Sequence, residues 1–359
     1  MQTGAIISIP RHSSAVKFPA VVSRIVLVAT LRFTYEVVMP VEPPYGIIAP
    51  KLKGGKVVPF LGAGASLGNR GPDARFDPDH PLFLPKADEL ARVLAEDSGF
   101  PSLKAEDRED LAKVSSYYVG VSGDGRPTLR QRLRYLLNPM TDPAAPSSVM
   151  ANKPMTLHRL LAALPTRQVI VTTNYDSLIE EAFNQVKRPY HLVIYPADRP
   201  ELVNQVLWWP HGESPQPVEA NKLAEHLDLR DATAPSVIFK MHGTRHPSDE
   251  THDHFVITEE DYLEFLSRMA NSAAIPPVFI PVFQERSFLF LGYGLRDWNL
   301  RLLLRNLPGQ TDKRLRSWAI QKYTSELETA LWQKRDVEIY PVDVNEFAEK
   351  IASKLGISS

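Results

Sequence analysis

The chain contains no cysteine among its 359 residues. This absence excludes disulfide bonds, zinc sites built from thiolate ligands and a cysteine nucleophile. Neither sign of charge dominates, because 41 Lys and Arg residues stand against 42 Asp and Glu residues, for a formal net charge of −1. Such a balance gives no support for a dedicated nucleic-acid surface, so we expect no direct binding of nucleic acid.

A long uninterrupted apolar run is also missing. Residues 20–39 are fairly apolar, but Arg24, Arg32 and Glu36 interrupt them. A bilayer span needs roughly 20 mostly apolar residues, and each charge near its centre costs about 2.5–3.5 kcal/mol. A signal peptide fits poorly as well, because no small-residue cleavage site follows. We therefore expect no membrane partner and a cytoplasmic location.

The length of the chain favours one large α/β domain over several small ones. Residues 1–45 are expected to form an amino-terminal extension, either as short strands or as a partner-binding arm, and an upstream-extended start codon would look the same. Residues 46–359 are expected to form a nucleotide-binding domain with a helical insertion at about 86–155.

Short apolar runs alternate with segments of helical spacing, which predicts a Rossmann-like, mostly parallel sheet with helices on both faces. The predicted strands are 57–61, 168–173, 236–241, 287–291, 316–321 and 337–342. The predicted helices are 87–97, 103–118, 128–137, 155–164, 177–186, 259–269 and 344–355. Residues 205–235 are expected to be irregular. Four predicted strands end in glycine or polar residues, where open α/β sheets bind ligands.

The first of these strand ends is Gly62-Ala63-Gly64-Ala65-Ser66. Glycines between a strand and a helix let backbone amides and the helix dipole approach a pyrophosphate. Leu67 stands where the usual dinucleotide motif has its third glycine, so a tight turn without a ligand explains the pattern equally well. The motif also lacks the Gly-Lys-Ser/Thr of phosphate-binding NTPase loops, and we expect no ATP hydrolysis.

The second strand end is Thr172-Thr173-Asn174-Tyr175-Asp176. Asn174 and Asp176 carry groups that can bind a ribose, an amide or an ordered water. On its own, the pattern is more typical of an Asx turn or of a cap on the helix that follows Ser177.

The third strand end is His242-Gly243, after an apolar run that closes with Lys240-Met241. A histidine in this position can act as a general base, because its unperturbed pKa of about 6.5 lies near neutral pH. A second His-Gly pair begins at His211, but Pro210 precedes it and would disturb a central strand. We therefore select His242, although a lone histidine is more often structural.

The fourth strand end, Gly292 to Asn299, repeats the order of strand, glycine and helix. Asp297 could accept a hydrogen bond from a ribose, and a plain capped turn explains the pattern equally well. Elsewhere, His252 and His254 lie in a polar segment without a specific ligand spacing, and we expect no metal site.

Taken in order, these four motifs resemble the sirtuin superfamily. The resemblance is closer to the sirtuin-like domains of bacterial anti-phage defence proteins, and it covers residues 47–355. It implies NAD as the bound substrate and His242 and Asn174 as the catalytic residues. The residues that it implies for binding NAD are Gly62, Ala63, Gly64 and Ser66 at the pyrophosphate and nearby ribose, Asp176 beside Asn174 at the nicotinamide ribose, Gly292, Tyr293 and Asp297 on the adenosine side, and also Thr173 and Gly243.

One departure from the family separates two activities. Deacylating sirtuins carry a four-cysteine zinc module after the His-Gly pair, whereas this chain has no cysteine. The resemblance to the defence proteins therefore implies hydrolysis of NAD to nicotinamide and ADP-ribose, without a metal. A protein deacylase and a catalytically silent NAD sensor remain alternatives. Because an uncontrolled NAD hydrolase would starve its host, we expect gating by a separate partner or by self-assembly, such as a homo-oligomer formed through residues 1–45. For the partner, the resemblance implies a HerA-like ATPase.

Overall fold

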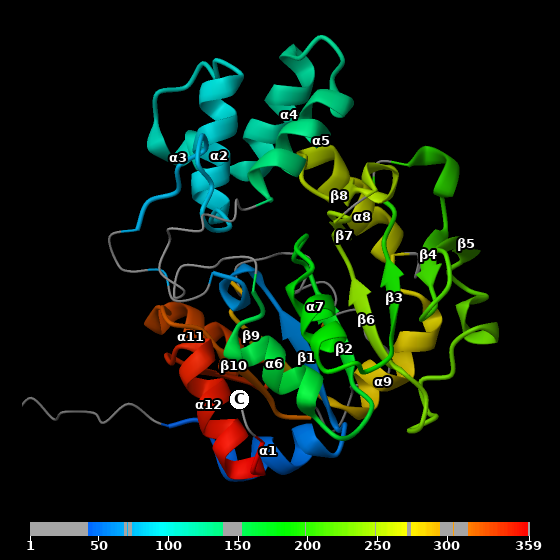
Figure 1. Ribbon diagram of the computed structural model, residues 1–359. Helices are drawn as coiled ribbons and strands as arrows, with labels where there is room; N and C mark the ends of the chain where they lie inside the picture. The colour runs from blue at the N-terminus through cyan, green and yellow to red at the C-terminus, as the bar shows by residue number, and fades with distance from the viewer. Residues whose placement is uncertain are drawn as a thin grey trace, which may run out of the picture. The chain divides into compact units, whose positions relative to one another are not determined.

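The computed structural model describes residues 42–67, 70, 74–138, 153–197, 199–247, 249–270, 274–294, 304 and 315–357 (Figure 1). The chain divides into two units, residues 1–40 and residues 41–359. The first unit lies outside the described residues, and so does the expected extension as far as residue 41. Everything below concerns the second unit.

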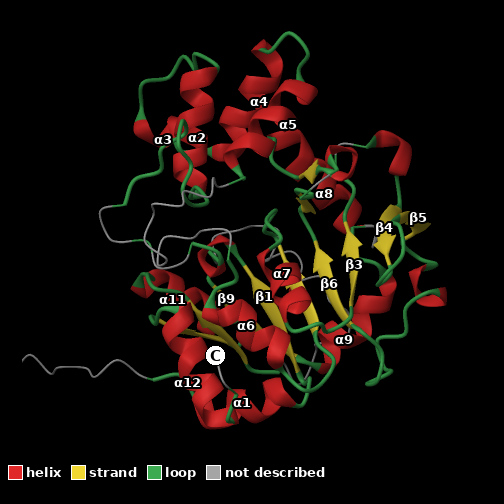
Figure 2. Cartoon of the chain, in the orientation of Figure 1, coloured by secondary structure: helices red, strands yellow, loops and turns green. Residues whose placement is uncertain are grey.

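A nine-stranded sheet forms the centre of the described part of the chain (Figure 2). Its strands, in chain order, are β1 (Val57–Leu61), β2 (Val169–Thr172), β3 (Tyr190–Ile194), β4 (Gln205–Trp209), β5 (Gln216–Glu219), β6 (Ser236–Lys240), β9 (Ser287–Leu291), β10 (Ser317–Ile320) and β11 (Val337–Tyr340). In space the order is β11-β10-β9-β1-β2-β6-β3-β4-β5. All neighbours from β11 to β3 pair in parallel, and only β4 and β5 add antiparallel pairs. The predicted Rossmann-like, mostly parallel sheet is confirmed.

Helices cover both faces of the sheet, because its strands are apolar on both sides. In β1, Val57 and Leu61 face one core while Val58 and Phe60 face the other. The helices on the first face are α1 (Tyr45–Lys53), α6 (Thr156–Ala163), α7 (Leu178–Gln185) and α12 (Val344–Leu355). Those on the second face are α8 (Glu259–Ala270), α9 (Ile280–Glu285) and α11 (Glu326–Gln333).

Four further helices form a group between β1 and β2 in the chain: α2 (Ala87–Asp97), α3 (Ala105–Arg108), α4 (Leu111–Val121) and α5 (Arg126–Leu136) (Figure 1). We call α2–α5 the insertion. It has its own apolar core, which extends onto Phe255 and Ile257 beside the short paired strands β7 (Gly243–Thr244) and β8 (His254–Phe255).

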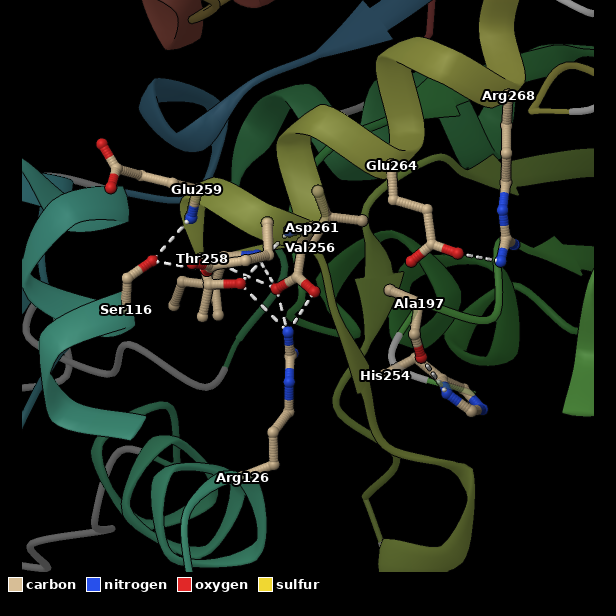
Figure 3. Close-up of polar contacts among 12 residues, drawn as sticks. Ser116, Arg126, Ala197, His254, Val256, Thr258, Glu259, Asp261, Glu264 and Arg268 are labelled. Carbon is tan, nitrogen blue, oxygen red and sulfur yellow. Dashed lines mark hydrogen bonds and ion pairs between the residues drawn. The ribbon is translucent and has the colours of Figure 1, made fainter. Parts of the chain in front are cut away.

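Polar contacts join the insertion to the start of α8 (Figure 3). Arg126 of α5 forms an ion pair with the buried carboxylate of Asp261. Ser116 of α4 donates from Oγ to Glu260 at 2.7 Å and accepts from the backbone N–H of Glu259 at 2.9 Å. The insertion is therefore held against α8 by charge as well as by apolar packing.

Two predictions about secondary structure were wrong. Residues 103–118 form two helices, because Asp110 interrupts the run and caps α4 by accepting from the N–H of Lys113 at 3.2 Å. Residues 205–235 are not all irregular, since they contain β4 and β5 at the end of the sheet. Pro210 does not disrupt the pairing of β4, because it comes after the last residue of that strand. Pro217 lies in an outermost strand, β5, where a missing N–H is tolerated.

Candidate functional site

A cavity of about 210 Å³ lies at the carboxyl ends of β1, β2 and β6. Six residues predicted for the site line it: Ala63, Ser66, Thr173, Asn174, Asp176 and His242. The rest of the wall comes from Leu67, Tyr175, Tyr262 and apolar residues at or next to the insertion, namely Leu84, Pro85, Ala87, Leu90, Leu111 and Leu137. The site therefore lies between the edge of the sheet and the insertion, and we call it the first cavity.

Asn174 ties two strand ends together. Its Nδ2 donates to the carbonyl oxygen of Gly62 and to Oγ of Ser66, both at 3.0 Å. A carbonyl oxygen can only accept, so this contact fixes which end of the amide carries the N–H groups. The amide nitrogen is thereby used within the protein. Its carbonyl oxygen Oδ1 is the atom that can accept from a ligand hydroxyl or from water.

Asp176 serves the backbone as well as lining the first cavity. Its Oδ1 accepts from the N–H of Leu178 at 3.0 Å, at the start of α7. This is the capping role that the sequence pattern favoured. The carbonyl oxygen of Asp176 also accepts from Nζ of Lys240 at 2.5 Å. The turn that carries Asn174 is therefore fixed at both of its ends.

Lys240 forms a buried ion pair that the sequence did not predict. Its side chain is 0% exposed, and Nζ lies 2.7 Å from Oε1 of Glu180 on α7. Two opposite charges in a dry environment attract strongly, but each has lost its hydration, so removing either one is costly. A lysine at the last position of an apolar strand was the signal available in the sequence.

His242 packs against two aromatic rings. It is 4% exposed, and its ring meets those of Tyr262 and Phe265 edge to face, at centroid distances of 5.7 and 5.4 Å. Its carbonyl oxygen accepts from the N–H of Val256 at 3.0 Å. These contacts fix the imidazole in the wall of the first cavity. His211, the rejected alternative, lines a different cavity.

The glycines of the first motif provide space for another part of the backbone. A Cβ on Gly62 would lie 2.5 Å from Cα of Tyr293, and a Cβ on Gly64 would lie 2.8 Å from the carbonyl oxygen of Gly292. Gly292 itself has a φ of +62°. The ends of β1 and β9 therefore touch through backbone atoms, and side chains on these glycines would prevent the contact.

Most backbone amides of this loop are already used. The N–H of Gly62 donates to Leu291 at 3.1 Å, and that of Gly64 donates to Gly292 at 2.8 Å. The loop continues into a three-residue 3-10 turn, Ala63–Ala65, so the helix expected to supply a dipole is absent here. Ala63 is exposed in the first cavity, and among the described residues its N–H donates to no protein acceptor.

The remaining predicted residues lie away from the first cavity or outside the described residues. Tyr293 is buried, with its ring 4.9 Å from that of Phe60, and neither it nor Gly292 lines the first cavity. Gly243 has a φ of +86° and serves the turn into β7. Asp297 lies outside the described residues. Of the predicted residues, the structure thus brings the polar ones together around the first cavity. It places Gly62, Gly64, Gly243, Gly292 and Tyr293 in backbone turns and packing contacts.

The sheet, its strand order and the first cavity define an α/β domain with a cavity at the carboxyl edge of its strands, where open α/β sheets bind ligands. Residues 168–340 match the family model of the SIR2-like domain. This match supports membership of the sirtuin-like superfamily and an NAD-related activity. A search of curated proteins returned no match. The matched segment includes Asn174 and His242, whereas the glycine loop and the insertion precede it.

Neither a membrane span nor a metal centre was found within the described ranges. No helix there is both long enough and apolar enough to cross a bilayer. No group of three or more His, Asp and Glu side chains in the same ranges is placed to hold a metal ion.

Proposed function

We propose that the protein hydrolyses NAD to nicotinamide and ADP-ribose in the first cavity. The observation that carries this proposal is the meeting of Ala63, Asn174 and His242, from three separate strand ends, in one wall. They supply an amide donor, a carbonyl acceptor and a titratable ring, which are the groups needed to hold a phosphate, orient a hydroxyl and accept a proton.

The first cavity fits NAD in chemical character. The exposed N–H of Ala63 can donate to a phosphate oxygen, and the leucines of the insertion can cover an apolar ring. Its volume of about 210 Å³ is below the usual range of about 300–1,000 Å³ for ligand pockets. One half of the dinucleotide fits, and the other half has to extend beyond the walls described here.

The proposed reaction breaks the N-glycosidic bond, and the bonding electron pair leaves with nicotinamide. Water adds its oxygen to the ribose carbon, and the proton that water loses passes to His242, by way of a ribose hydroxyl or directly. Asn174 accepts through Oδ1 from the water or from a ribose hydroxyl and so orients it. The apolar insertion limits access of bulk water to the reacting groups.

Hydrolysis is favoured over deacylation because the chain has no cysteine for a four-cysteine zinc module. The peptide groove of deacylating sirtuins depends on that module. In this chain the residues after His242-Gly243 lead instead through β8 into α8, whose first turn is bound to the insertion.

The test is an assay of NAD consumption by the purified full chain, with nicotinamide and ADP-ribose quantified. We expect the wild-type chain to release the two products in equal molar amounts. We expect no release from His242→Ala or from Asn174→Ala. O-acyl-ADP-ribose formed from an acyl-lysine peptide would identify a deacylase instead. Binding of NAD without any product would indicate a sensor.

The biological setting is part of the same proposal and rests on the resemblance, together with the harm that uncontrolled loss of NAD would do to the host. We propose that this is a cytoplasmic effector of anti-phage defence, gated by homo-oligomer formation or by a HerA-like ATPase. The assay is therefore run with the chain alone and with such an ATPase added. Absence of product under both conditions would contradict the proposal.

A further inference from the structure

A second cavity, of about 260 Å³, is lined in part by residues that follow those of the first one directly in the chain. Asp176 lines the first cavity and Ser177, the next residue, lines the second. Three parts of the chain form the wall of the second cavity. They are α7 with the residue before it (Ser177, Glu180, Glu181, Asn184), strand β3 (Tyr190, Leu192, Ile194), and the segments Trp209–Gly212 and Thr244–Pro247. The proposed hydrolysis of NAD makes no use of this second cavity.

The second cavity exists because of how the sheet ends. From β3 onward the pairing is antiparallel, and such pairs need no crossover helix. Among the described residues, only loops and one 3-10 turn therefore connect β3, β4 and β5, and Tyr190 of β3 and Trp209 of β4 stay half-buried. The space beside α7 is left to side chains that are chemically diverse.

One wall of the second cavity is acidic. Glu180 and Glu181 project from α7, and the Glu180 side chain is 8% exposed. Oε1 of Glu180 is paired with Lys240, but Oε2 is buried and accepts no hydrogen bond among the described residues. Because the terminal torsion of Glu is broad, a modest rotation can present this oxygen to a donor in the second cavity.

The other wall carries aromatic rings and imidazoles, and burial lowers the pKa of His246. The ring of Trp209 stacks on that of His246 at 4.9 Å and 25°, and the ring of His211 lies 6.3 Å from that of Tyr190. Nε1 of Trp209 already donates to the carbonyl oxygen of Glu213. Arg245, whose guanidinium donates to Oδ1 of Asn138 at 3.0 Å, adds a permanent cation to this wall. A ligand that fits both walls is planar, has a hydrogen-bond donor at one end and is anionic at the other.

We propose that the second cavity binds an aminopurine nucleotide, with the amine directed to Glu180 and the phosphate to Arg245 and His246. Arginine and imidazole are suited to phosphate, and a carboxylate oxygen is suited to an exocyclic amine. A volume of about 260 Å³ is enough for a mononucleotide and too small for a complete dinucleotide.

The consequence for the first cavity follows from one lysine, and this step alone rests on the proposed NAD hydrolysis. Nζ of Lys240 contacts Glu180 in the wall of the second cavity and the carbonyl oxygen of Asp176 in the wall of the first. A donor that engages Glu180 changes the balance between these two contacts. The nucleotide therefore alters the turn that holds Asn174, and with it the rate of NAD turnover.

The test is isothermal titration of the full chain with AMP in the presence of saturating ADP-ribose. AMP is expected to bind under these conditions, and IMP, which has a carbonyl in place of the amine, is expected to bind at least about tenfold more weakly. Arg245→Gln should weaken AMP binding by about tenfold or more and leave the preference for AMP over IMP unchanged. Lys222→Ala, outside the second cavity, is the matched control, and thermal unfolding verifies that each variant is folded.

Three results would overturn the proposal: displacement of AMP by ADP-ribose, equal affinity for AMP and IMP, or unchanged AMP affinity in a folded Arg245→Gln protein. Titration reads binding independently of turnover. A chain that binds AMP as described but releases no nicotinamide from NAD would refute the proposed hydrolysis and leave the nucleotide site standing.

Discussion

The strand ends around the first cavity fall into two groups, one whose residues allow backbone contacts and one whose side chains line the cavity. On the side of β1 and β9, Gly62, Gly64 and Gly292 are glycines because two backbone segments touch there. On the side of β2 and β6, Asn174 and His242 present side-chain groups to the cavity while their neighbours fix their positions.

This difference changes the interpretation of the glycine motif. Its pattern led us to expect glycines that admit a pyrophosphate, yet the amides of Gly62 and Gly64 are occupied by carbonyl oxygens of the chain. What remains for a ligand on this side is the N–H of Ala63. The comparison predicts that substitutions on the glycine side change stability, whereas those facing the cavity from the polar side change turnover.

The largest effect is expected at the polar side, from His242→Ala. Loss of a general base lowers turnover by about 10²–10⁴-fold, while the folded structure persists. The measurement is the initial rate of nicotinamide release, with circular dichroism as the check on folding. His80→Ala, at an exposed histidine whose side chain is 77% accessible, is the matched control and should keep the full rate. Near-normal turnover in a folded His242→Ala protein would contradict the assignment.

The next largest effect is expected from Lys240→Met. This change should lower stability although it lies on the polar side, because Lys240 forms a buried ion pair with Glu180 and holds the carbonyl oxygen of Asp176. The change leaves the Glu180 carboxylate buried without its counter-charge, and we expect a loss of about 3–5 kcal/mol in the free energy of unfolding. Urea denaturation measures this loss. The double variant Lys240→Met, Glu180→Gln should recover much of it, and equal instability of the two variants would show that the ion pair is not the cause.

A smaller loss, on the glycine side, is expected from Gly292→Ala. The added Cβ would lie 2.3 Å from the backbone nitrogen of Ala65, at a φ of +62°. Overpacking of this kind costs about 1–3 kcal/mol, seen as a lower denaturation midpoint. Gly294→Ala is the control, because its Cβ would have no neighbour within 4 Å. If the two variants were equally stable, the backbone contact would not be the reason for the glycine.

The smallest effect is expected from Ser116→Ala, which removes two hydrogen bonds between the insertion and α8. We predict a loss of about 0.5–1.5 kcal/mol per bond and faster hydrogen exchange at the start of α8. Ser122→Ala serves for comparison, because Ser122 Oγ bonds within its own helix to the carbonyl oxygen of Tyr118. Unchanged exchange in the Ser116 variant would show that the Arg126–Asp261 ion pair and the apolar packing hold the insertion without these two bonds.

The sequence predicted the central strands well because their pattern is local. The run 57–61 is wholly apolar, the run 287–291 is apolar after Ser287, and they form β1 and β9 with the predicted bounds. β3 was missed, and β4 was hidden by the neighbouring Pro210, since strands at the end of a sheet carry a weaker signal.

The candidate site was predictable only in part, because part of it depends on distant residues. Asn174 and His242 end adjacent parallel strands, and parallel order places such residues together. The pairing of Lys240 with Glu180 joins residues 60 positions apart, and no local pattern shows it. Likewise, a glycine in the sequence does not reveal whether the space that it leaves belongs to a ligand or to another strand, as Gly62 demonstrates.

The most direct test of a ligand site in the first cavity is hydrogen exchange of the wild-type chain with and without ADP-ribose, which avoids turnover. The N–H of Ala63 donates to no protein acceptor in the described structure, so a bound phosphate should slow its exchange. We predict slower exchange in peptides that contain Ala63 and Asn174. Unchanged exchange in both peptides at saturating ADP-ribose would contradict the placement of the ligand.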